Sequence, residues 1–259
     1  MKYALVGYPL SHSMSPQIHK KLFEESKHAN ATYVLREITA ENFDDQVRTL
    51  FEYDGFNVTI PHKISIIKHL DELDETAARY NAVNTVKCCN GKNIGYNTDV
   101  QGFLSSIKLL GASLTGNVAV LGCGGTGRMM AIETALAGGN LTVAVRRQDF
   151  SAAQTLADDI YKLKPNANIT ITDIQALQGD FDLISNATPV GMYPNINDCP
   201  ISDNILKNVP FVFDAVYNPT ETVLLKTAKS YGAKTLSGLS MLIRQAAAAH
   251  EIWYGDRSE

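Results

Sequence analysis

The sequence has few cysteines, and their spacing matches neither a disulfide framework nor a metal site. Its 259 residues include only Cys88, Cys89, Cys123 and Cys199, with no C-x-x-C pair. This usage indicates a reducing environment such as the cytoplasm. No group of His, Cys and carboxylate residues has metal-ligand spacing, so we expect no bound metal. A G-x-S-x-G motif is also missing, which argues against a hydrolase-type serine nucleophile.

Long apolar runs and an excess of one charge are absent as well. No apolar run approaches the roughly 18 residues of a membrane span, and the N-terminus has no signal-peptide pattern. The formal net charge of −4 offers no attraction to nucleic acid or to an anionic membrane. We therefore expect a soluble cytoplasmic protein, a monomer or a homodimer, whose partner is a small molecule.

Short apolar strands alternate with helical segments along most of the chain, which is typical of α/β proteins. In the first part we expect strands at residues 3–6, 33–36, 55–58, 83–89 and 93–96, and helices at 16–28, 40–51, 61–70 and 72–80. Asn90-Gly91 lies between the last two strands and is typical of a two-residue hairpin. Those strands should pair antiparallel, so the first sheet should be mixed.

The second part of the chain continues the alternation without a hairpin signal. We expect strands at residues 118–121, 141–145, 168–171, 182–185 and 211–214, with helices between them. A helix at about 100–110 should connect the two parts, and a last helix should run from Gly238 to Tyr254. Periodicity leaves open which part this last helix packs against.

Three glycines follow the first strand of the second part. Gly122, Gly124 and Gly127 form G-x-G-x-x-G between a strand and a helix. The first permits a tight turn, the second lets the backbone approach a pyrophosphate, and the third allows close helix–strand packing. A Walker A loop is excluded because Arg128 stands where its lysine would be. We therefore expect a Rossmann-type, doubly wound parallel sheet that binds a dinucleotide.

Arg146 and Arg147 follow the next strand, where an NAD site usually carries a carboxylate for the ribose hydroxyls. Two guanidinium groups suit a 2′-phosphate instead. The residues therefore predict NADP as the cofactor, with NAD as the less favoured alternative.

Hydroxyl groups gather in the loop before the first expected helix. Ser11, Ser13 and Ser15 lie within five positions of one another. Ser15 alone would serve as a helix N-cap. Three hydroxyls also suit a carboxylate or a polyhydroxylated ligand, and both interpretations stay open.

A lysine and a carboxylate are the candidate acid–base residues. Asn57 and Thr59 lie at a strand end, and Lys63 stands at the start of an expected helix, where its charge opposes the helix dipole. This mismatch favours a ligand or acid–base role over a solvated surface lysine. Asp99 begins the connecting helix, either as a helix-capping carboxylate or as the partner of Lys63.

Several longer motifs follow one another along the chain. They are Ser11-His-Ser-Met-Ser-Pro16, Asn57-Val-Thr-Ile-Pro-His-Lys63, Ala82-Val-Asn-Thr85, Asn97-Thr-Asp99 with Gly102, Asn186-Ala-Thr-Pro-Val-Gly-Met192, Asp214 with Tyr217 and Pro219, and Gly238-Leu-Ser-Met-Leu-Ile-Arg-Gln-Ala246. In order and spacing they closely resemble the motifs of the shikimate dehydrogenase family.

The resemblance implies a reversible, NADPH-dependent reduction of 3-dehydroshikimate to shikimate in aromatic amino acid biosynthesis. It implies that Lys63 is the acid–base residue and Asp99 its partner. The implied substrate-binding residues are Ser13, Ser15, Thr59, Asn84, Asp99, Tyr217 and Gln245. The implied cofactor-binding residues are Gly122, Cys123, Gly124, Gly125, Thr126, Gly127, Arg146, Arg147, Asn186, Thr188, Ala215 and Gly238, together with Glu75.

The resemblance also implies the domain organisation. Residues 1–99, completed by the C-terminal helix 237–259, would form a substrate-binding and catalytic domain built on a mixed sheet. Residues 100–236 would form the dinucleotide-binding domain.

The chain departs from the family pattern after the second strand of this domain. Arg146-Arg147 stands in place of the usual N-R-T, and Ala152 stands near a position that is usually basic. Two other interpretations are therefore kept: a quinate/shikimate dehydrogenase that uses NAD, and a non-catalytic dinucleotide-binding sensor. The presence of both Lys63 and Asp99 argues against the sensor.

Overall fold

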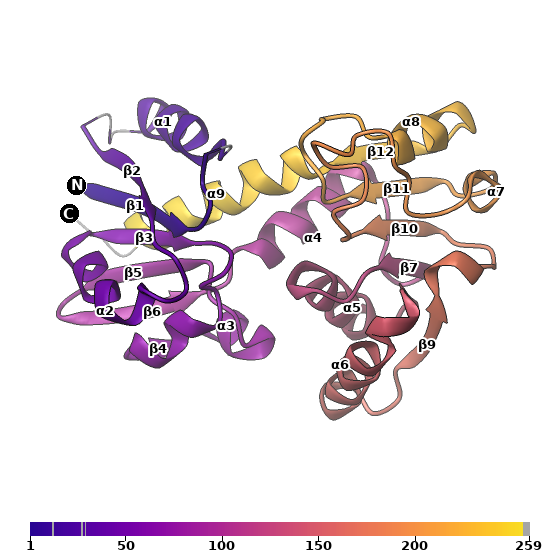
Figure 1. Ribbon diagram of the computed structural model, residues 1–259, viewed down its shortest axis with the longest axis horizontal. Coiled ribbons are helices and arrows are strands. Elements are labelled where there is room, and N and C mark those ends of the chain that lie inside the picture. Colours follow the sequence, from indigo (N-terminus) through magenta and orange to yellow (C-terminus); the bar gives the residue numbers. More distant parts are fainter. Residues whose placement is uncertain (12, 27, 29, 256–259) are drawn as a thin grey trace. The chain divides into compact units, whose positions relative to one another are not determined.

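The computed structural model describes residues 1–11, 13–26, 28 and 30–255, so His12 of the serine-rich loop lies outside the described residues. The chain divides into two compact units, Met1–Gly102 with Leu242–Glu259, and Phe103–Met241 (Figure 1). Helices α4 (Asp99–Leu110) and α9 (Gly238–Tyr254) carry the chain from one unit into the other.

The first unit is built on a mixed six-stranded sheet in the order β2-β1-β3-β5-β6-β4. Its strands are β1 (Lys2–Gly7), β2 (Thr32–Glu37), β3 (Gly55–Val58), β4 (Glu72–Leu73), β5 (Thr85–Cys89) and β6 (Lys92–Tyr96). β1 pairs parallel with β2 and β3, whereas β5 pairs antiparallel with β3 and β6. The expected hairpin is confirmed, because Asn90 and Gly91 both have the positive φ that a type I′ turn requires.

Alternating side chains of β1 enter two different layers of core. Ala4 and Val6 pack with Phe43 and Ile66 of the helical segments on one face, whereas Tyr3 packs with apolar side chains of α1 and α9 on the other. The helical segments are α1 (Ser15–Glu25), α2 (Phe43–Gln46), the 3₁₀ helices η1 (Val47–Glu52) and η2 (Ser65–His69), and α3 (Glu75–Tyr80).

The prediction of a helix at residues 61–70 is wrong. Only the short 3₁₀ helix η2 forms there, and Lys63 lies in the loop before it. The Lys63 carbonyl accepts a hydrogen bond from Val83 N at 2.8 Å, so it is not part of an α-helical ladder. The argument that Lys63 opposes a helix dipole therefore does not hold.

Two further expected helices are shorter than predicted. Residues 40–51 form α2 followed by η1, and residues 72–80 begin with the two-residue strand β4 before α3. β4 adds to the edge of the sheet through parallel pairing with β6. Such a short strand has too few residues to show a periodic pattern.

The second unit has a parallel six-stranded sheet in the order β12-β11-β10-β7-β8-β9. Its strands are β7 (Asn117–Leu121), β8 (Asn140–Val145), β9 (Asn168–Asp173), β10 (Leu183–Asn186), β11 (Phe211–Asp214) and β12 (Lys234–Ser237). The strand order reverses between β7 and β10, where doubly wound sheets bind their ligands. The expected fold class, a mixed-sheet α/β unit joined to a Rossmann-type unit, is confirmed.

Helices cover the parallel sheet and connect its strands. They are α5 (Gly125–Ala137), α6 (Phe150–Leu163), α7 (Asp203–Leu206) and α8 (Val223–Ser230), with the short 3₁₀ helices η3 (Arg147–Asp149) and η4 (Ile174–Ala176). The edge strand β12 was not expected from the sequence, because its partly exposed residues Lys234–Ser237 lack an apolar run.

The C-terminal part of α9 completes the interior of the first unit. Trp253 is 1% exposed, stacks on Tyr3 with ring centroids 4.4 Å apart, and donates from Nε1 to Val86 O at 3.0 Å. A Cβ atom at Gly55 would collide with the indole of Trp253. The absence of a side chain at Gly55 therefore creates the space that the indole fills.

Beside Trp253, a pair of buried histidines joins α1 to α9. His19 Nδ1 lies 3.0 Å from His250 Nε2. Burial lowers the pKa of His19 well below its usual value, and His250 lowers it further. Burial also lowers the pKa of His250, to about 4, with a contribution from His28. Both rings are therefore neutral at physiological pH.

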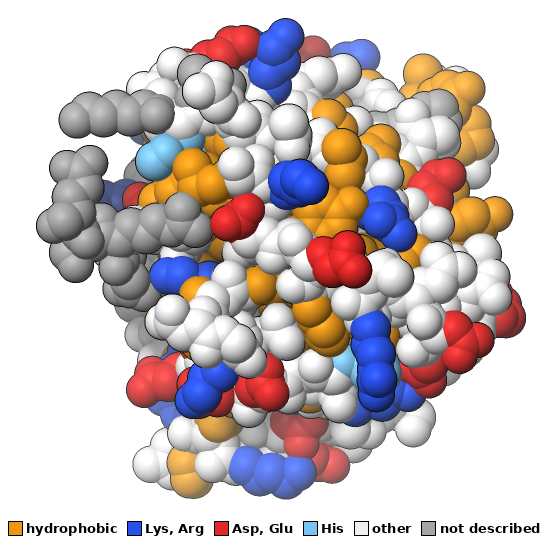
Figure 2. Space-filling view, turned by 90° about the vertical axis from the view of Figure 1, so that its left-hand side faces the viewer, with side chains coloured by type: hydrophobic (Ala, Val, Ile, Leu, Met, Phe, Trp, Pro, Cys, Tyr) orange, Lys and Arg blue, Asp and Glu red, His pale blue; other side chains and the backbone are white. Residues whose placement is uncertain are grey.

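The surface shows no concentration of one charge on the face drawn in Figure 2, where acidic and basic side chains are interspersed. Among the described residues, no helix is both long and apolar enough to cross a membrane.

We expect the free energy of unfolding to decrease as the pH falls from about 6.5 towards 4. In this range the unfolded chain binds protons at His19 and His250 that the folded unit excludes, so stability is complete only above the ordinary histidine pKa. The slope should reach at most about 1.4 kcal/mol per pH unit for each histidine. Urea titrations of the wild type and of His250→Gln measure it, and the variant should have the shallower slope. Equal slopes below pH 6.5 would contradict this expectation.

Candidate active site

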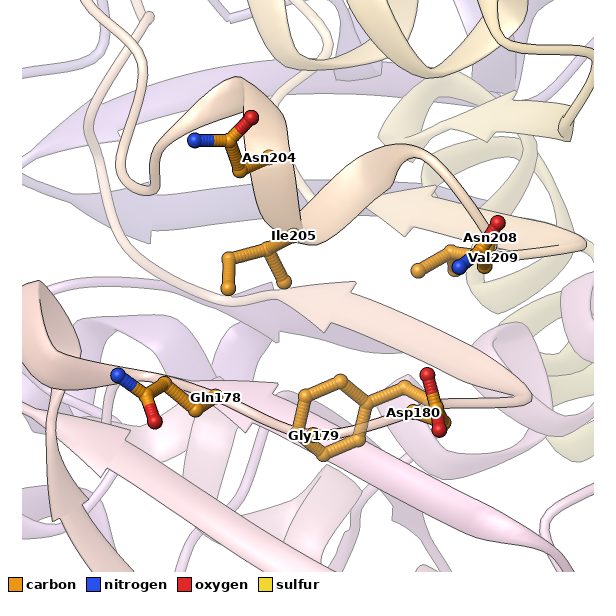
Figure 3. A pocket seen from close by; sticks show the side chains of 8 residues that line it. Gln178, Gly179, Asp180, Asn204, Ile205, Asn208 and Val209 are labelled. Atoms are coloured by element: carbon orange, nitrogen blue, oxygen red, sulfur yellow. The ribbon is translucent and has the colours of Figure 1, made fainter.

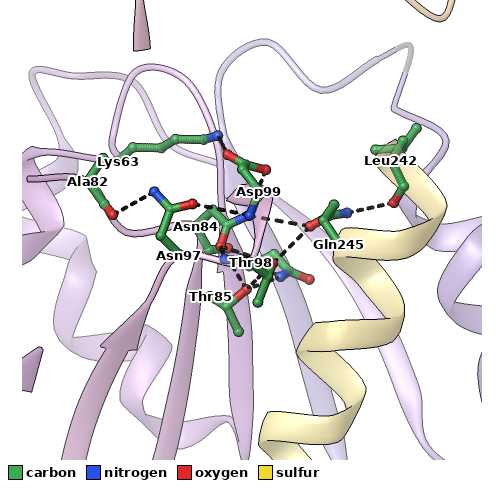
Figure 4. Close-up of polar contacts among 10 residues, drawn as sticks. Lys63, Ala82, Asn84, Thr85, Asn97, Thr98, Asp99, Leu242 and Gln245 are labelled. Atoms are coloured by element: carbon green, nitrogen blue, oxygen red, sulfur yellow. Dashed lines mark hydrogen bonds and ion pairs between the residues drawn. The ribbon is translucent and has the colours of Figure 1, made fainter. Parts of the chain in front are cut away.

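Lys63 and Asp99 form an ion pair that belongs to a polar cluster in the first unit (Figure 4). Lys63 Nζ lies 2.5 Å from Asp99 Oδ2, and the two side chains are 27% and 18% exposed. Asp99 is also the first residue of α4. This carboxylate therefore stands in the first turn of a helix and pairs with Lys63.

The amide of Asn84 fixes the orientation of Asp99. Asn84 Oδ1 accepts hydrogen bonds from Thr98 N at 2.7 Å and from the hydroxyls of Thr85 at 3.0 Å and Thr98 at 3.1 Å. Its Nδ2 therefore faces Asp99 Oδ1 at 2.8 Å and Gln245 Oε1 at 3.5 Å. The reverse orientation would turn the NH₂ group towards the donor Thr98 N, so only one orientation satisfies the neighbours.

The loop that carries Lys63 is anchored on both sides of this residue. His62 is 1% exposed, its Nε2 lies 2.6 Å from Ile38 O, and its ring stacks on Phe43 at 4.0 Å. The backbone hydrogen bond from Val83 N holds the Lys63 carbonyl next to Asn84. The backbone of Lys63 is therefore fixed, while its long side chain reaches Asp99.

The predicted hydroxyl residues follow the carboxyl ends of two neighbouring strands. Ser13 and Ser15 come after β1, and Thr59 follows β3, which pairs parallel with β1. Ser15 is 8% exposed and its backbone N–H donates to Ser13 Oγ at 3.3 Å. The N-cap of α1 is Met14, without a side-chain hydrogen bond. The interpretation of Ser15 as the helix cap is therefore wrong.

In the second unit, the loop Gly122–Gly127 joins β7 to α5. Gly122 has a φ of +91°, which L side chains rarely adopt, and a Cβ at Gly127 would collide with the Gly122 carbonyl. Gly124 and Gly125 are exposed, and an added Cβ at either would meet no atom within 4 Å. The turn is thus closed on its inner side and open at the N-terminus of α5, as a pyrophosphate site requires.

Two arginines follow β8, at the same carboxyl ends of the parallel strands as the glycine loop. Arg146 Nε donates to Asp149 Oδ2 and Arg147 Nε donates to Asp173 Oδ2, each at 2.8 Å. Cys123 of the glycine loop also lies next to this group, with its Sγ 4.0 Å from Asp149 O. The structure therefore brings the predicted 2′-phosphate ligands close to the glycine loop, each already paired with a carboxylate.

A buried polar cluster supports the loop that follows β10. Asn186 Oδ1 accepts hydrogen bonds from Thr188 N at 3.0 Å and Oγ1 at 2.7 Å, and its Nδ2 donates to Asp214 Oδ1 at 2.9 Å. Asp214 Oδ2 accepts from Thr222 Oγ1 at 2.7 Å. Burial raises the pKa of Asp214, and these hydrogen bonds oppose the rise. A Cβ at Gly122 would lie 3.0 Å from Thr188 Cγ2, so this loop packs against the glycine turn.

The remaining predicted residues lie on further segments. Ala215 follows β11, and a Cβ at Gly238 would collide with its carbonyl, so the start of α9 packs closely on this backbone. Tyr217 is half-buried in the loop after β11, where burial raises its pKa. Glu75 is exposed at the start of α3 in the first unit. The contacts of Tyr217 with a substrate and of Glu75 with a cofactor stay predictions.

A cavity of about 220 Å³ lies elsewhere in the second unit (Figure 3). It is lined by Gln178–Phe181 and by Asn204, Ile205, Asn208 and Val209. Residues 178–181 precede β10, so this cavity opens at the amino ends of the parallel strands, opposite to the glycine loop. Within the described residues, no group of three or more His, Cys, Asp and Glu side chains is placed to hold a metal ion.

Sequence reasoning gave no role to several residues that complete the polar cluster. Asn57 donates from Nδ2 to Thr85 Oγ1 at 3.0 Å and to Asn84 O at 3.2 Å, and Tyr33 OH donates to Asn57 Oδ1 at 2.8 Å. Asn57 is buried within β3, and an amide in a buried strand is the sequence signal that could have assigned it a role.

Comparison with known proteins identifies the family. Residues 5–86 match the model of the shikimate dehydrogenase substrate binding domain. The chain is 41% identical over 256 residues to a shikimate dehydrogenase (NADP(+)) of Methanococcus maripaludis, an alignment that covers 97% of this chain and 91% of that protein. The chain belongs to the shikimate dehydrogenase family. The resemblance expected from the motifs is confirmed.

Solved structures related to this family have the same fold. Shikimate 5-dehydrogenase from Thermus thermophilus, in complex with NADP(H) and shikimate, is 31% identical with a TM-score of 0.88, covering 98% of this chain and 94% of that chain. Quinate dehydrogenase from Corynebacterium glutamicum, in complex with NAD, is 31% identical with a TM-score of 0.85 and the same coverage of both chains.

We expect Gly124→Ala to weaken dinucleotide binding without lowering stability. Gly124 has φ −63° and ψ −177°, which alanine adopts, and an added methyl group would meet only an approaching ligand. Affinity for NADP⁺ should fall by about tenfold, roughly 1.4 kcal/mol, in a calorimetric titration.

Gly127→Ala is the matched contrast, because its methyl group would collide with the Gly122 carbonyl. It should lower the free energy of unfolding by about 1 kcal/mol or more in the absence of ligand. If Gly124→Ala binds NADP⁺ as tightly as the wild type does, the glycine loop is not the pyrophosphate site.

Proposed function

We propose that this protein is a shikimate dehydrogenase that catalyses the reversible, NADPH-dependent reduction of 3-dehydroshikimate to shikimate in aromatic amino acid biosynthesis. The Lys63–Asp99 pair, oriented by Asn84, is the observation that carries the proposal, because a carbonyl reduction needs one positioned proton donor. Relatives that share about two-fifths of its residues over nearly the whole chain bear this name.

Lys63 is the proposed acid–base residue. Its ammonium group donates a proton to the carbonyl oxygen during reduction, and its amine accepts that proton during oxidation. Asp99 holds Nζ at 2.5 Å, and Asn84 holds Asp99 in turn, so the proton is exchanged from a fixed position. The pair is only partly exposed, which strengthens its electrostatic interaction relative to a pair in water.

The other predicted residues of the first unit bind the substrate in this proposal. Ser13, Ser15 and Thr59 offer hydroxyl groups, while Asn84 and Gln245 offer amides. Hydroxyls and amides both donate and accept hydrogen bonds, which suits a polyhydroxylated carboxylic acid. Asp99 and Tyr217 complete the proposed set.

The second unit would hold the cofactor. Gly122, Cys123, Gly124, Gly125, Thr126 and Gly127 form the loop that receives the pyrophosphate, at the N-terminus of α5. Arg146 and Arg147 receive the 2′-phosphate, while Asn186, Thr188, Ala215, Gly238 and Glu75 are the remaining proposed contacts. Bound NADPH supplies the hydride.

One observation favours a second candidate, a quinate/shikimate dehydrogenase that uses NAD. Both arginines are paired with carboxylates, which reduces the positive charge available to a 2′-phosphate. A similar fold at 31% identity belongs to a quinate dehydrogenase that was crystallised with NAD.

The rest of the proposal follows from this activity. The first unit is the substrate-binding and catalytic domain and the second is the dinucleotide-binding domain. The protein acts on a small molecule in the cytoplasm, as a monomer or a homodimer.

We expect Lys63→Ala to lower kcat by roughly 10²–10⁴-fold, the usual contribution of a positioned acid–base group. The dissociation constant of NADP⁺ should stay within about twofold of the wild-type value, because the glycine loop and the two arginines that are proposed to hold NADP⁺ all belong to the second unit. Lys68→Ala is the matched control, since this exposed lysine pairs with Asp44 at 2.6 Å. A Lys63→Ala enzyme that keeps half of the wild-type kcat would refute the assignment.

We expect Asp99→Asn to impair both substrate binding and turnover. Its two oxygens accept hydrogen bonds from Asn84 Nδ2 and Lys63 Nζ, so either orientation of an asparagine amide places its NH₂ group against a donor. If the carboxylate served only as a helix cap, asparagine would replace it well. Steady-state kinetics that match the wild type would support the cap alone.

Steady-state rates with shikimate and quinate, each with NADP⁺ and NAD⁺, test the proposed function directly. We expect the highest kcat/KM for shikimate with NADP⁺. A higher value for quinate with NAD⁺ would favour the second candidate, and no turnover of any pair would favour a non-catalytic sensor.

A further inference from the structure

The two arginines after β8 are held by the same atom of their guanidinium groups. Arg146 is 68% exposed and Arg147 is 88% exposed, yet each donates from Nε to a carboxylate at 2.8 Å. In the part of the chain that the structure describes, neither arginine has another hydrogen bond. The two Nη groups of each arginine therefore remain available to a ligand.

The two carboxylates come from different elements. Asp149 ends η3, which begins at Arg147, whereas Asp173 ends β9. Asp173 pairs in register with Val145, the last residue of β8, so it lies beside the point where the arginines begin. The Asp173 side chain is 17% exposed, and its Oδ1 accepts a hydrogen bond from Gln175 N at 3.1 Å. Asp173 is thus a fixed anchor for an exposed arginine.

These carboxylates also cancel the charge of the arginines. The hydrogen bond from Arg147 lowers the pKa of Asp173, so Asp173 is ionised at neutral pH. Two arginines and two aspartates sum to a net charge of zero at this edge of the sheet. An approaching phosphate is attracted by the guanidinium groups and repelled by the carboxylates behind them.

We propose that Asp149 and Asp173 determine how strongly this protein distinguishes phosphorylated from unphosphorylated dinucleotides. The inference rests on the proposed function, in which Arg146 and Arg147 receive the 2′-phosphate. Each aspartate orients its arginine through Nε and at the same time weakens the attraction for the phosphate. The protein therefore discriminates less than two unpaired arginines would.

Aspartate-to-asparagine variants separate the two effects. In Asp149→Asn the amide oxygen still accepts the Nε hydrogen bond, but the negative charge is gone. Asp173→Asn also removes the charge, but its single amide oxygen accepts from either Arg147 Nε or Gln175 N, because both oxygens of Asp173 accept hydrogen bonds. We expect each variant to bind 2′,5′-ADP about 3- to 10-fold more tightly than the wild type at low salt. Binding of 5′-AMP, which lacks the 2′-phosphate, should change by less than about twofold. Calorimetric titrations of the full chain with both nucleotides measure this.

Two controls test the electrostatic origin of the gain. Raising the ionic strength should reduce it, because salt screens exposed charges. Asp180→Asn removes the same charge from an exposed position before β10, at the amino ends of the strands. It should leave the affinities for 2′,5′-ADP and 5′-AMP unchanged. Asp149→Ala removes the anchor together with the charge, so its gain should be smaller than that of Asp149→Asn.

Unchanged or weaker binding of 2′,5′-ADP by both asparagine variants would overturn the inference, as would an equal gain for 5′-AMP. The titrations measure binding without turnover, so their outcome tests the role of the two aspartates separately from the proposed enzymatic activity. If the variants show the expected changes in affinity but the protein does not oxidise shikimate, only the proposed activity is refuted. If the protein oxidises shikimate but the variants show no such changes, only the proposed role of the two aspartates is refuted.

Discussion

The orientation of one buried amide, that of Asn84, determines the polar arrangement of the first unit. Its oxygen is surrounded by donors, so its nitrogen must face the carboxylate of Asp99. The same logic extends outward, because Tyr33 OH donates to Asn57 Oδ1 and turns the nitrogen of that amide towards Thr85. Asn57, Asn84, Thr85 and Thr98 are buried, and a buried polar group without a partner is costly. The ion pair with Lys63 is thus the end of a hydrogen-bond chain that begins at the edge strand β2.

The second unit creates its candidate site by different means. Its loop presents backbone rather than side chains, and the role of the glycines depends on their having no Cβ atom. Gly122 and Gly127 let two stretches of backbone approach closely, whereas Gly124 and Gly125 leave the end of α5 uncovered. The buried side chains of Asn186 and Asp214 support the neighbouring loop. A site of this kind depends on the shape of the main chain, and a site like that around Asn84 depends on the identity of each polar atom.

Much of the fold was predictable because its strands are short, apolar and bounded by turn residues. Gly55–Val58 and Phe211–Asp214 were placed correctly on that basis. The helix at residues 61–70 failed because long-range contacts decide this segment: Val83 binds the Lys63 carbonyl, and the buried ring of His62 binds Ile38. No local pattern contains those partners.

The candidate site shows the same division between local and distant information. The motifs marked Lys63, Asp99, Asn84 and Gln245, and the structure brings these four side chains together. What the motifs lacked was the environment of Arg147, because its partner Asp173 lies on a strand that is adjacent only in the folded sheet. Local sequence identified the groups that carry charge, and the register of β8 against β9 determined how that charge is balanced.

Helix α9 sets the order in which the chain can be completed during synthesis. The first unit needs Trp253 against Tyr3 and His250 against His19, and these partners are translated only after all of the second unit. Until then, the space beside Gly55 lacks the indole that fills it, and this face of the sheet lacks the apolar contacts of α9. The unit that is translated first therefore cannot complete its core until α9 has been made, and a chain that stalls before α9 lacks the contacts of Trp253 and His250.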